Sequence, residues 1–126
     1  MPRSDAKVHA GRMAYHAGLS AEASVIREYE TQGYTFEAQR WRGQGGEIDL
    51  ILRKCGVVVF VEVKKSRSFE AAALRISLKQ KQRIFAAAEE FVTTEPKGLL
   101  TDMRFDVALV NATGAVQILE NALSEG

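Results

Sequence analysis

The sequence predicts an α/β domain in which a mixed central β-sheet is flanked by helices, in the order α-β-β-β-α-β-β. Short apolar runs with strand-like alternation lie at residues 34–41, 47–64 and 103–119. Segments whose apolar residues recur at helical spacing precede the first run and separate the second from the third. Helices alternating with such strands are typical of a layered α/β sandwich.

The first two elements are a helix and a strand. The helix is expected from about residue 19 to Gly33, because glycine is a natural C-terminal stop. Glu22 falls on its apolar stripe, where a glutamate is unusual unless it only reaches the rim to contact solvent. The strand spans residues 34–41, and one of its sides is expected to carry Tyr34, Phe36 and Ala38.

The remaining elements have clearer boundaries. Residues 43–46 form a glycine-rich turn, which we interpret as a connection into the second strand rather than a phosphate-binding loop. Ser77-x-x-Gln80 resembles a capping box and predicts a helix through Val92. Two more strands are expected over residues 103–110 and 115–119.

Length and composition are those of one soluble globular domain. The chain has 126 residues, of which 46% are hydrophobic and 26% charged. Residues 1–17 are expected to be a flexible basic leader, and 18–126 the single folded domain. The apolar runs are too short to span a membrane, and the lone cysteine, Cys55, fits a reducing compartment. The cytoplasm is the expected location.

The hairpin between residues 47 and 64 carries charges within its apolar runs. A tight loop at Cys55-Gly56 pairs residues whose numbers sum to 111, which sets Asp49 across from Glu62 and Glu47 across from Lys64. Opposed carboxylates repel, and partial burial adds to the cost. A divalent cation with oxygen ligands would offset this repulsion, so the register predicts a metal site.

A simpler interpretation also exists for each of these residues. Acids at strand ends are usually solvated, and an acid near a lysine is often only a surface ion pair worth roughly 0–1 kcal/mol. The grouping of Glu47, Asp49, Glu62 and Lys64 on one face of one hairpin favours the metal site.

A basic segment follows directly after the hairpin. Residues 64–83 contain seven basic side chains and one acid, although the whole chain has a net charge of only +1. Such a segment is either a solvated helix face or a phosphate-binding surface. The candidates for nucleic-acid contact are Lys65, Arg67, Lys79, Lys81 and Gln82.

The hairpin resembles the PD-(D/E)xK nuclease superfamily. Asp49 matches the first acid of that pattern, and Glu62-x-Lys64 matches the second acid and the lysine. Glu22 resembles the additional glutamate of the Holliday-junction resolvase branch. From about residue 18 to 119 the chain is similar to the small bacterial YraN-type family, through Gly46-Glu47-Ile48-Asp49-Leu50-Ile51, Val59-Phe60-Val61-Glu62-Val63-Lys64, Lys81-Gln82 and Arg104-Phe105-Asp106.

This resemblance implies a restriction-endonuclease-like core and metal-dependent cleavage of DNA, rather than RNA, with branched or junction DNA as one substrate class. Asp49, Glu62, Glu22 and the Val63 carbonyl would hold Mg²⁺ or Mn²⁺, and Lys64 would orient the attacking water. Resolvase relatives act as dimers, so a homodimer is compatible. Two alternatives remain: a non-catalytic nucleic-acid-binding module that works in a larger assembly, and a domain with a structural ion pair only.

Overall fold

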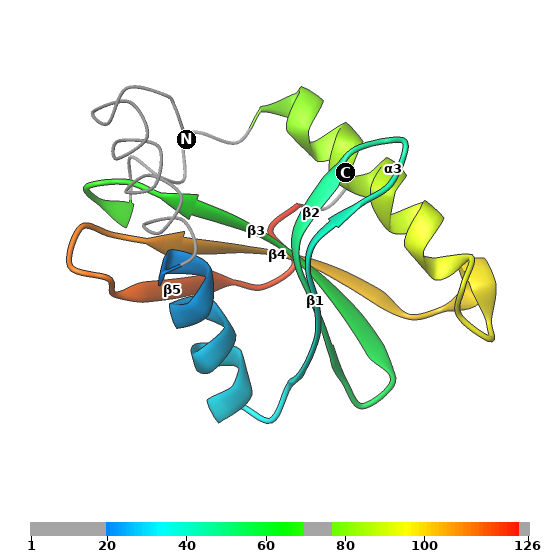
Figure 1. Cartoon of the computed structure of the whole chain (residues 1–126), viewed down its shortest axis with the longest axis horizontal. Coiled ribbons are helices and arrows are strands. Elements are labelled where there is room, and N and C mark those ends of the chain that lie inside the picture. Colours follow the sequence, from blue (N-terminus) through cyan, green and yellow to red (C-terminus); the bar gives the residue numbers. More distant parts are fainter. Residues whose placement is uncertain (1–19, 70–76, 124–126) are drawn as a thin grey trace, which may run out of the picture.

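The computed structural model describes residues 20–69 and 77–123, so the predicted leader lies outside the described residues. Five strands form one mixed sheet in the order β1-β2-β3-β4-β5, which confirms the predicted α/β class (Figure 1). In the described part, no helix has the length and apolar character needed to cross a membrane. The labelled elements are β1 (Thr35–Arg42), β2 (Glu47–Lys54), β3 (Val57–Lys65), α3 (Leu78–Val92), η1 (Gly98–Leu100), β4 (Met103–Val110) and β5 (Val116–Leu119).

Strand pairing places β3 at the centre of the sheet. β2 runs antiparallel to it, from Lys54↔Val57 to Leu50↔Val61, and these partners have the predicted sum of 111. β4 runs parallel to β3 on the other side, as a crossover through α3 allows, and β5 closes the sheet antiparallel to β4.

Each face of the sheet is covered by one helix (Figure 1). Residues 20–31 form the N-terminal helix, whose Val25 and Tyr29 pack with Leu50 and Val61 on one face. α3 covers the other face, where Phe91 packs edge-on against Phe60 at 5.8 Å between ring centroids. Successive side chains along β2 and β3 point to opposite faces, so these two strands contribute apolar residues to both buried faces of the sheet.

The predicted capping box of α3 is present in full. The Ser77 hydroxyl accepts from the Gln80 amide N–H at 3.1 Å, and the Gln80 side-chain oxygen accepts from the Ser77 N–H at 3.2 Å. These two bonds satisfy backbone donors that the first turn of a helix would otherwise leave without partners.

The side-chain alternation predicted for β1 is wrong beyond Phe36. A β-bulge between Phe36 and Ala38 shifts the register, so Tyr34 packs on the face of the N-terminal helix while Ala38 packs on the α3 face. One extra residue in a strand reverses the facing of all that follow. Arg40, just beyond the bulge, has φ of 53°, a left-handed conformation uncommon for an arginine.

The glycine-rich turn is fastened to α3 by a carboxylate. Glu90 accepts from the backbone N–H groups of Gln44 at 2.8 Å and Gly45 at 2.7 Å, and these bonds lower the pKa of Glu90. A Cβ at Gly45 would lie 2.7 Å from the Cβ of Ala86, so only glycine permits this approach. The turn is thus a structural connection, as predicted, and holds the start of β2 against α3.

Candidate active site

The site lies where β2 and β3 separate. Backbone pairing between the two strands ends at Leu50↔Val61. At the residue before Leu50, the Asp49 side chain takes the place of the backbone partner that β3 would otherwise have. Its Oδ2 accepts from the Val63 backbone N–H at 2.8 Å. The sheet therefore opens at a point where a carboxylate, rather than a backbone carbonyl, satisfies the donor of the neighbouring strand.

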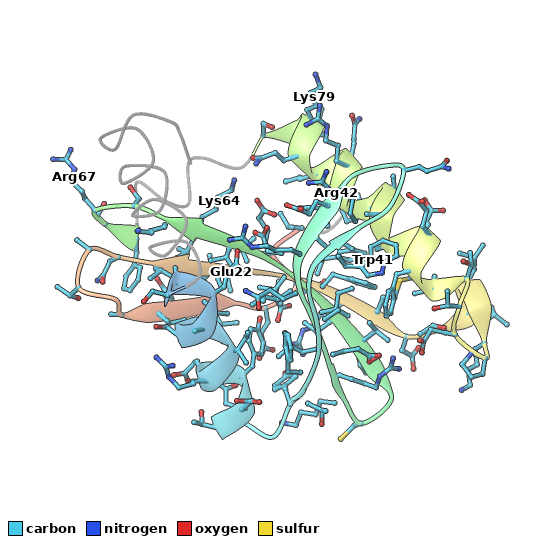
Figure 2. The ribbon with its side chains drawn as sticks, viewed as in Figure 1. Glu22, Trp41, Arg42, Lys64, Arg67 and Lys79 are labelled. Atoms are coloured by element: carbon cyan, nitrogen blue, oxygen red, sulfur yellow. The ribbon has the colours of Figure 1, made fainter. Side chains whose placement is uncertain are left out.

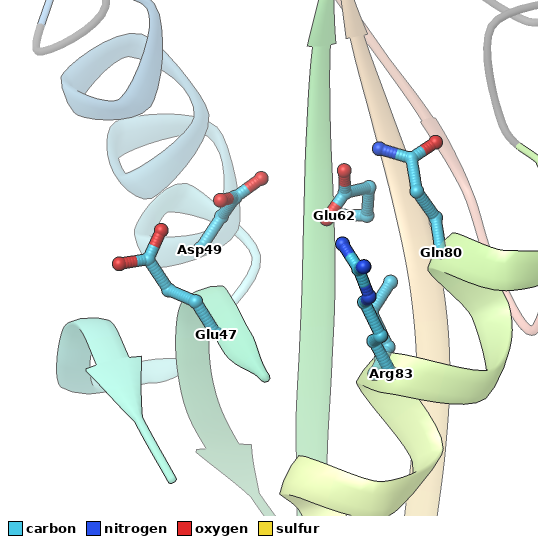
Figure 3. A pocket seen from close by; sticks show the side chains of 6 residues that line it. Glu47, Asp49, Glu62, Gln80 and Arg83 are labelled. Atoms are coloured by element: carbon cyan, nitrogen blue, oxygen red, sulfur yellow. The ribbon is translucent and has the colours of Figure 1, made fainter. Parts of the chain in front are cut away.

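A cavity of about 300 Å³ occupies the space between this opening and α3 (Figure 3). We call it the carboxylate cavity. Three acids from β2 and β3 form one wall, and α3 supplies the other. Its described lining residues are Glu47, Asp49, Glu62, Gln80, Arg83 and Ile84.

The two central carboxylates strongly influence one another. The pKa of Asp49 is raised to about 7, first by burial and next by the negative charge of Glu62. The Val63 N–H bond opposes this rise, whereas the charge of Glu22 adds to it. Glu62 is itself buried, with 8% of its surface exposed. The backbone pairing ends before the predicted Asp49–Glu62 pair, but the two carboxylates line one cavity and carry the expected electrostatic cost.

Lys64 lies beside this pair. Its Nζ is 3.0 Å from Glu62 Oε2, and its side chain is only 15% exposed. We expected Glu47 to lie across from Lys64, but Glu47 Oε2 instead bonds Arg42 Nη2 at 3.1 Å. The lysine thus compensates the charge of Glu62 directly, because residues two apart on a strand share a face.

Glu22 lies on the inward face of the N-terminal helix, as predicted, with 7% of its surface exposed. Its Oε1 accepts from Gln39 Nε2 at 2.5 Å and from Arg40 Nε at 3.2 Å. Its charge reaches Asp49, but it does not join Asp49 and Glu62 in one ligand set. Among residues 20–69 and 77–123, no three His, Cys, Asp or Glu side chains are grouped closely enough to hold a metal ion.

A pair of acids with a nearby carbonyl still fits a hard cation. All available donors are oxygens, which Mg²⁺ and Mn²⁺ prefer, and a cation beside Asp49 would lower the cost that burial and the charge of Glu62 place on its ionised form. Asp49 and Glu62 are the residues that could hold such an ion, with Val63 adjacent to both.

A comparison with known protein families gives a match that includes the residues of this site. A family model described as "Uncharacterised protein family UPF0102" matches residues 21–110. The chain belongs to this family. The match confirms the resemblance to YraN-type proteins, and it extends from the residue before Glu22 to the end of β4.

Relatives in the UPF0102 family share nearly the whole chain. A UPF0102 protein of Roseobacter denitrificans is 82% identical over 126 residues, which cover 100% of this chain and 98% of the relative. A UPF0102 protein of Cereibacter sphaeroides is 54% identical over 114 residues, or 90% of this chain and 97% of the relative. One from Dinoroseobacter shibae is 42% identical over 120 residues.

The basic candidates do not line the cavity. Lys65, Arg67, Lys79 and Gln82 are exposed and Lys81 is half-buried, and none of these five lines the carboxylate cavity. Figure 2 shows Arg67 and Lys79 pointing away from the ribbon. Their role in nucleic-acid contact stays a prediction.

Sequence reasoning did not identify Gln80 and Arg83 as site residues. The signal was available in their spacing, because residues three apart on a helix share a face. Ile84 is buried, at 3% exposure, and its burial orients α3 so that Gln80 and Arg83 line the cavity. Gln80 was recognised only as a capping residue, and Arg83 only as part of the basic segment.

Arg104 and Asp106 form an ion pair with a structural role. The Arg104 guanidinium makes two bonds of 2.8 Å to the fully buried Asp106 carboxylate. Tyr29 Oη donates to the same carboxylate at 2.8 Å, and the Asn121 backbone N–H donates at 2.9 Å. Because the buried charge is fully hydrogen-bonded, it ties the N-terminal helix to β4.

Proposed function

We propose that the chain is a metal-dependent nuclease that hydrolyses phosphodiester bonds of DNA, with branched or junction DNA as the first substrates to test. The observation that carries the proposal is the opposition of Asp49 and Glu62 at one cavity, with Lys64 Nζ 3.0 Å from Glu62. Opposed, partly buried carboxylates lower the stability of the fold. Their presence therefore favours a functional role over a structural one.

Asp49 and Glu62 would hold Mg²⁺ or Mn²⁺, and the Val63 carbonyl is a further candidate ligand. Such an ion, when bound, makes a water molecule more acidic and stabilises negative charge on a phosphate. Lys64 would position the attacking water and balance charge near Glu62, to which it is already bonded. The Val63 N–H fixes the orientation of the Asp49 carboxylate, so this ligand needs little reorganisation.

A second candidate function is supported by the position of Glu22. Since Gln39 and Arg40 bond its carboxylate, the third acid is held outside the Asp49–Glu62 pair. A module that binds branched or single-stranded DNA without cleaving it, as part of a larger assembly, would not need Glu22 as a ligand.

One experiment separates the two functions. Junction, flap and single-stranded DNA substrates are incubated with the protein in Mn²⁺, in Mg²⁺ and in EDTA, and cleavage and gel-shift are measured in parallel. The nuclease proposal expects cleavage that requires the metal and is lost in Asp49→Asn and Lys64→Ala. The exposed residues Asp102 and Lys97 provide charge-matched controls, Asp102→Asn and Lys97→Ala. Cleavage that persists unchanged in Asp49→Asn would contradict the proposal, whereas a gel-shift without cleavage supports the binding module.

A further inference from the structure

Arg83 is the only cationic side chain among the described residues that line the carboxylate cavity. Figure 3 shows its guanidinium extending from α3 toward Glu62, across the cavity from Glu47 and Asp49. Among the described lining residues one guanidinium faces three acids, so the lining by itself carries more negative than positive formal charge. A phosphate would be repelled unless Arg83 and a cation on the Asp49–Glu62 pair acted on it together.

Arg83 lines the same cavity as three acids, but among the described residues its side chain is bonded to none of them. Across residues 20–69 and 77–123, its guanidinium has no hydrogen bond or ion pair. Two of the three acids of the cavity already have basic partners, since Arg42 bonds Glu47 and Lys64 bonds Glu62. All five N–H donors of Arg83 therefore remain available to a ligand in the cavity.

The backbone that carries Arg83 is held in place. A Cβ on Gly46 would lie 3.0 Å from Arg83 Cβ and 3.1 Å from the Arg83 carbonyl oxygen, so the glycine turn lies directly against this residue. Glu90, two turns further along α3, fastens the same turn through the N–H groups of Gln44 and Gly45. The base of the Arg83 side chain is thus held against the turn that leads into β2 at Glu47.

Gln80 adds neutral donors one helical turn earlier. Its side-chain oxygen is occupied by the Ser77 N–H in the capping box. This assigns the amide nitrogen to the opposite side, and Figure 3 shows that nitrogen on the side of Gln80 nearer Glu62. A guanidinium fork and an amide –NH₂ on one wall are donors suited to the unesterified oxygens of a phosphodiester.

We propose that Arg83, assisted by Gln80, binds the phosphate that is positioned for cleavage, with the α3 wall holding the phosphodiester against the Asp49–Glu62 pair. This inference rests on the proposed nuclease function. It assigns phosphate binding within the cavity to Arg83 rather than to Lys81 or Gln82, which do not line it. The exposed basic residues outside the cavity would then contact flanking phosphates only.

The test compares Arg83→Ala and Arg83→Lys with Arg27→Ala. Arg27 is an exposed arginine on the N-terminal helix and does not line the cavity, so its removal changes the net charge equally. Fluorescence anisotropy with labelled junction and single-stranded DNA, in Ca²⁺ and in EDTA, measures affinity at several salt concentrations. Because each phosphate contact releases counterions, Arg83→Ala should reduce the slope of log affinity against log salt by about 0.7–0.9. Affinity should fall roughly tenfold.

Arg83→Lys keeps the charge but loses the fork, so it should restore the salt slope and only part of the affinity. Arg27→Ala should match the wild type in both. The Arg83 assignment is overturned if Arg83→Ala and Arg27→Ala have equal affinities and slopes. If the wild type binds DNA but never cleaves it in Mn²⁺, the nuclease proposal is refuted. The binding comparison between the variants still decides whether Arg83 contacts a phosphate. If the wild type binds none of these DNA probes, both proposals are refuted.

Discussion

Asp49→Asn is expected to stabilise the metal-free protein. Burial and the charge of Glu62 raise the pKa of Asp49 from 3.8 to about 7, so ionising this group above pH 7 costs the folded state up to about 4 kcal/mol. Asparagine carries no charge, and its side-chain oxygen can still accept from the Val63 N–H. After allowance for solvent relaxation, we expect the free energy of unfolding at pH 8 to rise by about 1–4 kcal/mol.

The pH dependence fixes the sign of this effect. A carboxyl whose pKa is raised by folding binds its proton more tightly in the folded state, so the wild type loses stability as the pH rises from about 4 to 7. The advantage of Asp49→Asn should therefore be largest above pH 7, and more than half of it should disappear at pH 5. Urea denaturation in EDTA, followed through the fluorescence of the single tryptophan, Trp41, measures both values.

The matched control is Asp102→Asn, which neutralises an exposed acid and should change stability by less than about 0.5 kcal/mol at either pH. Mg²⁺ should stabilise the wild type, by about 2.7 kcal/mol at a hundred times its dissociation constant, and leave Asp49→Asn unaffected. The electrostatic reasoning is refuted if Asp49→Asn is no more stable than the wild type at pH 8, or if its advantage is the same at pH 5.

Three further changes test other parts of the structure. Tyr29→Phe removes a 2.8 Å bond to the buried Asp106 carboxylate and should lower the free energy of unfolding by about 1–3 kcal/mol in urea denaturation; an unchanged value would contradict the role of this bond. Gly45→Ala places a Cβ 2.7 Å from that of Ala86 and should cost about 1–3 kcal/mol by the same measurement, whereas wild-type stability would show that the turn can shift freely. The affinity for Mn²⁺, measured by calorimetry, should be about tenfold weaker at pH 6 than at pH 8, because the ion must displace the proton of Asp49; a pH-independent affinity would remove Asp49 from the ligand set.

The strand register could be predicted because the hydrophobic pattern allows only one arrangement. A shift of one residue would place Asp49 and Glu62 on the valine face, and the observed pairs from Lys54↔Val57 to Leu50↔Val61 agree with the arrangement that avoids this. The capping box at Ser77 and Gln80 was equally predictable, because it depends on two side chains three residues apart.

Other features depend on contacts between distant segments. The bulge in β1 has no local signal, since inserting one residue at Glu37 is compatible with either facing of Ala38. The separation of β2 and β3 at Asp49 is visible only when the Val63 N–H is given a partner. Arg83 could be assigned to the cavity only after the burial of Ile84 had fixed the rotation of α3.

The bond between Tyr29 and Asp106 fixes one end of the helix face that also carries Glu22. Tyr29 follows Glu22 by seven residues, which is two turns and about 10 Å along the same face of the N-terminal helix. Since Arg104 and the Asn121 N–H hold Asp106 in place, the hydroxyl of Tyr29 anchors this end of the N-terminal helix to β4. The N-terminal helix is therefore held at two points of one face, at β4 through Tyr29 and at β1 through the bonds that Gln39 and Arg40 make to Glu22.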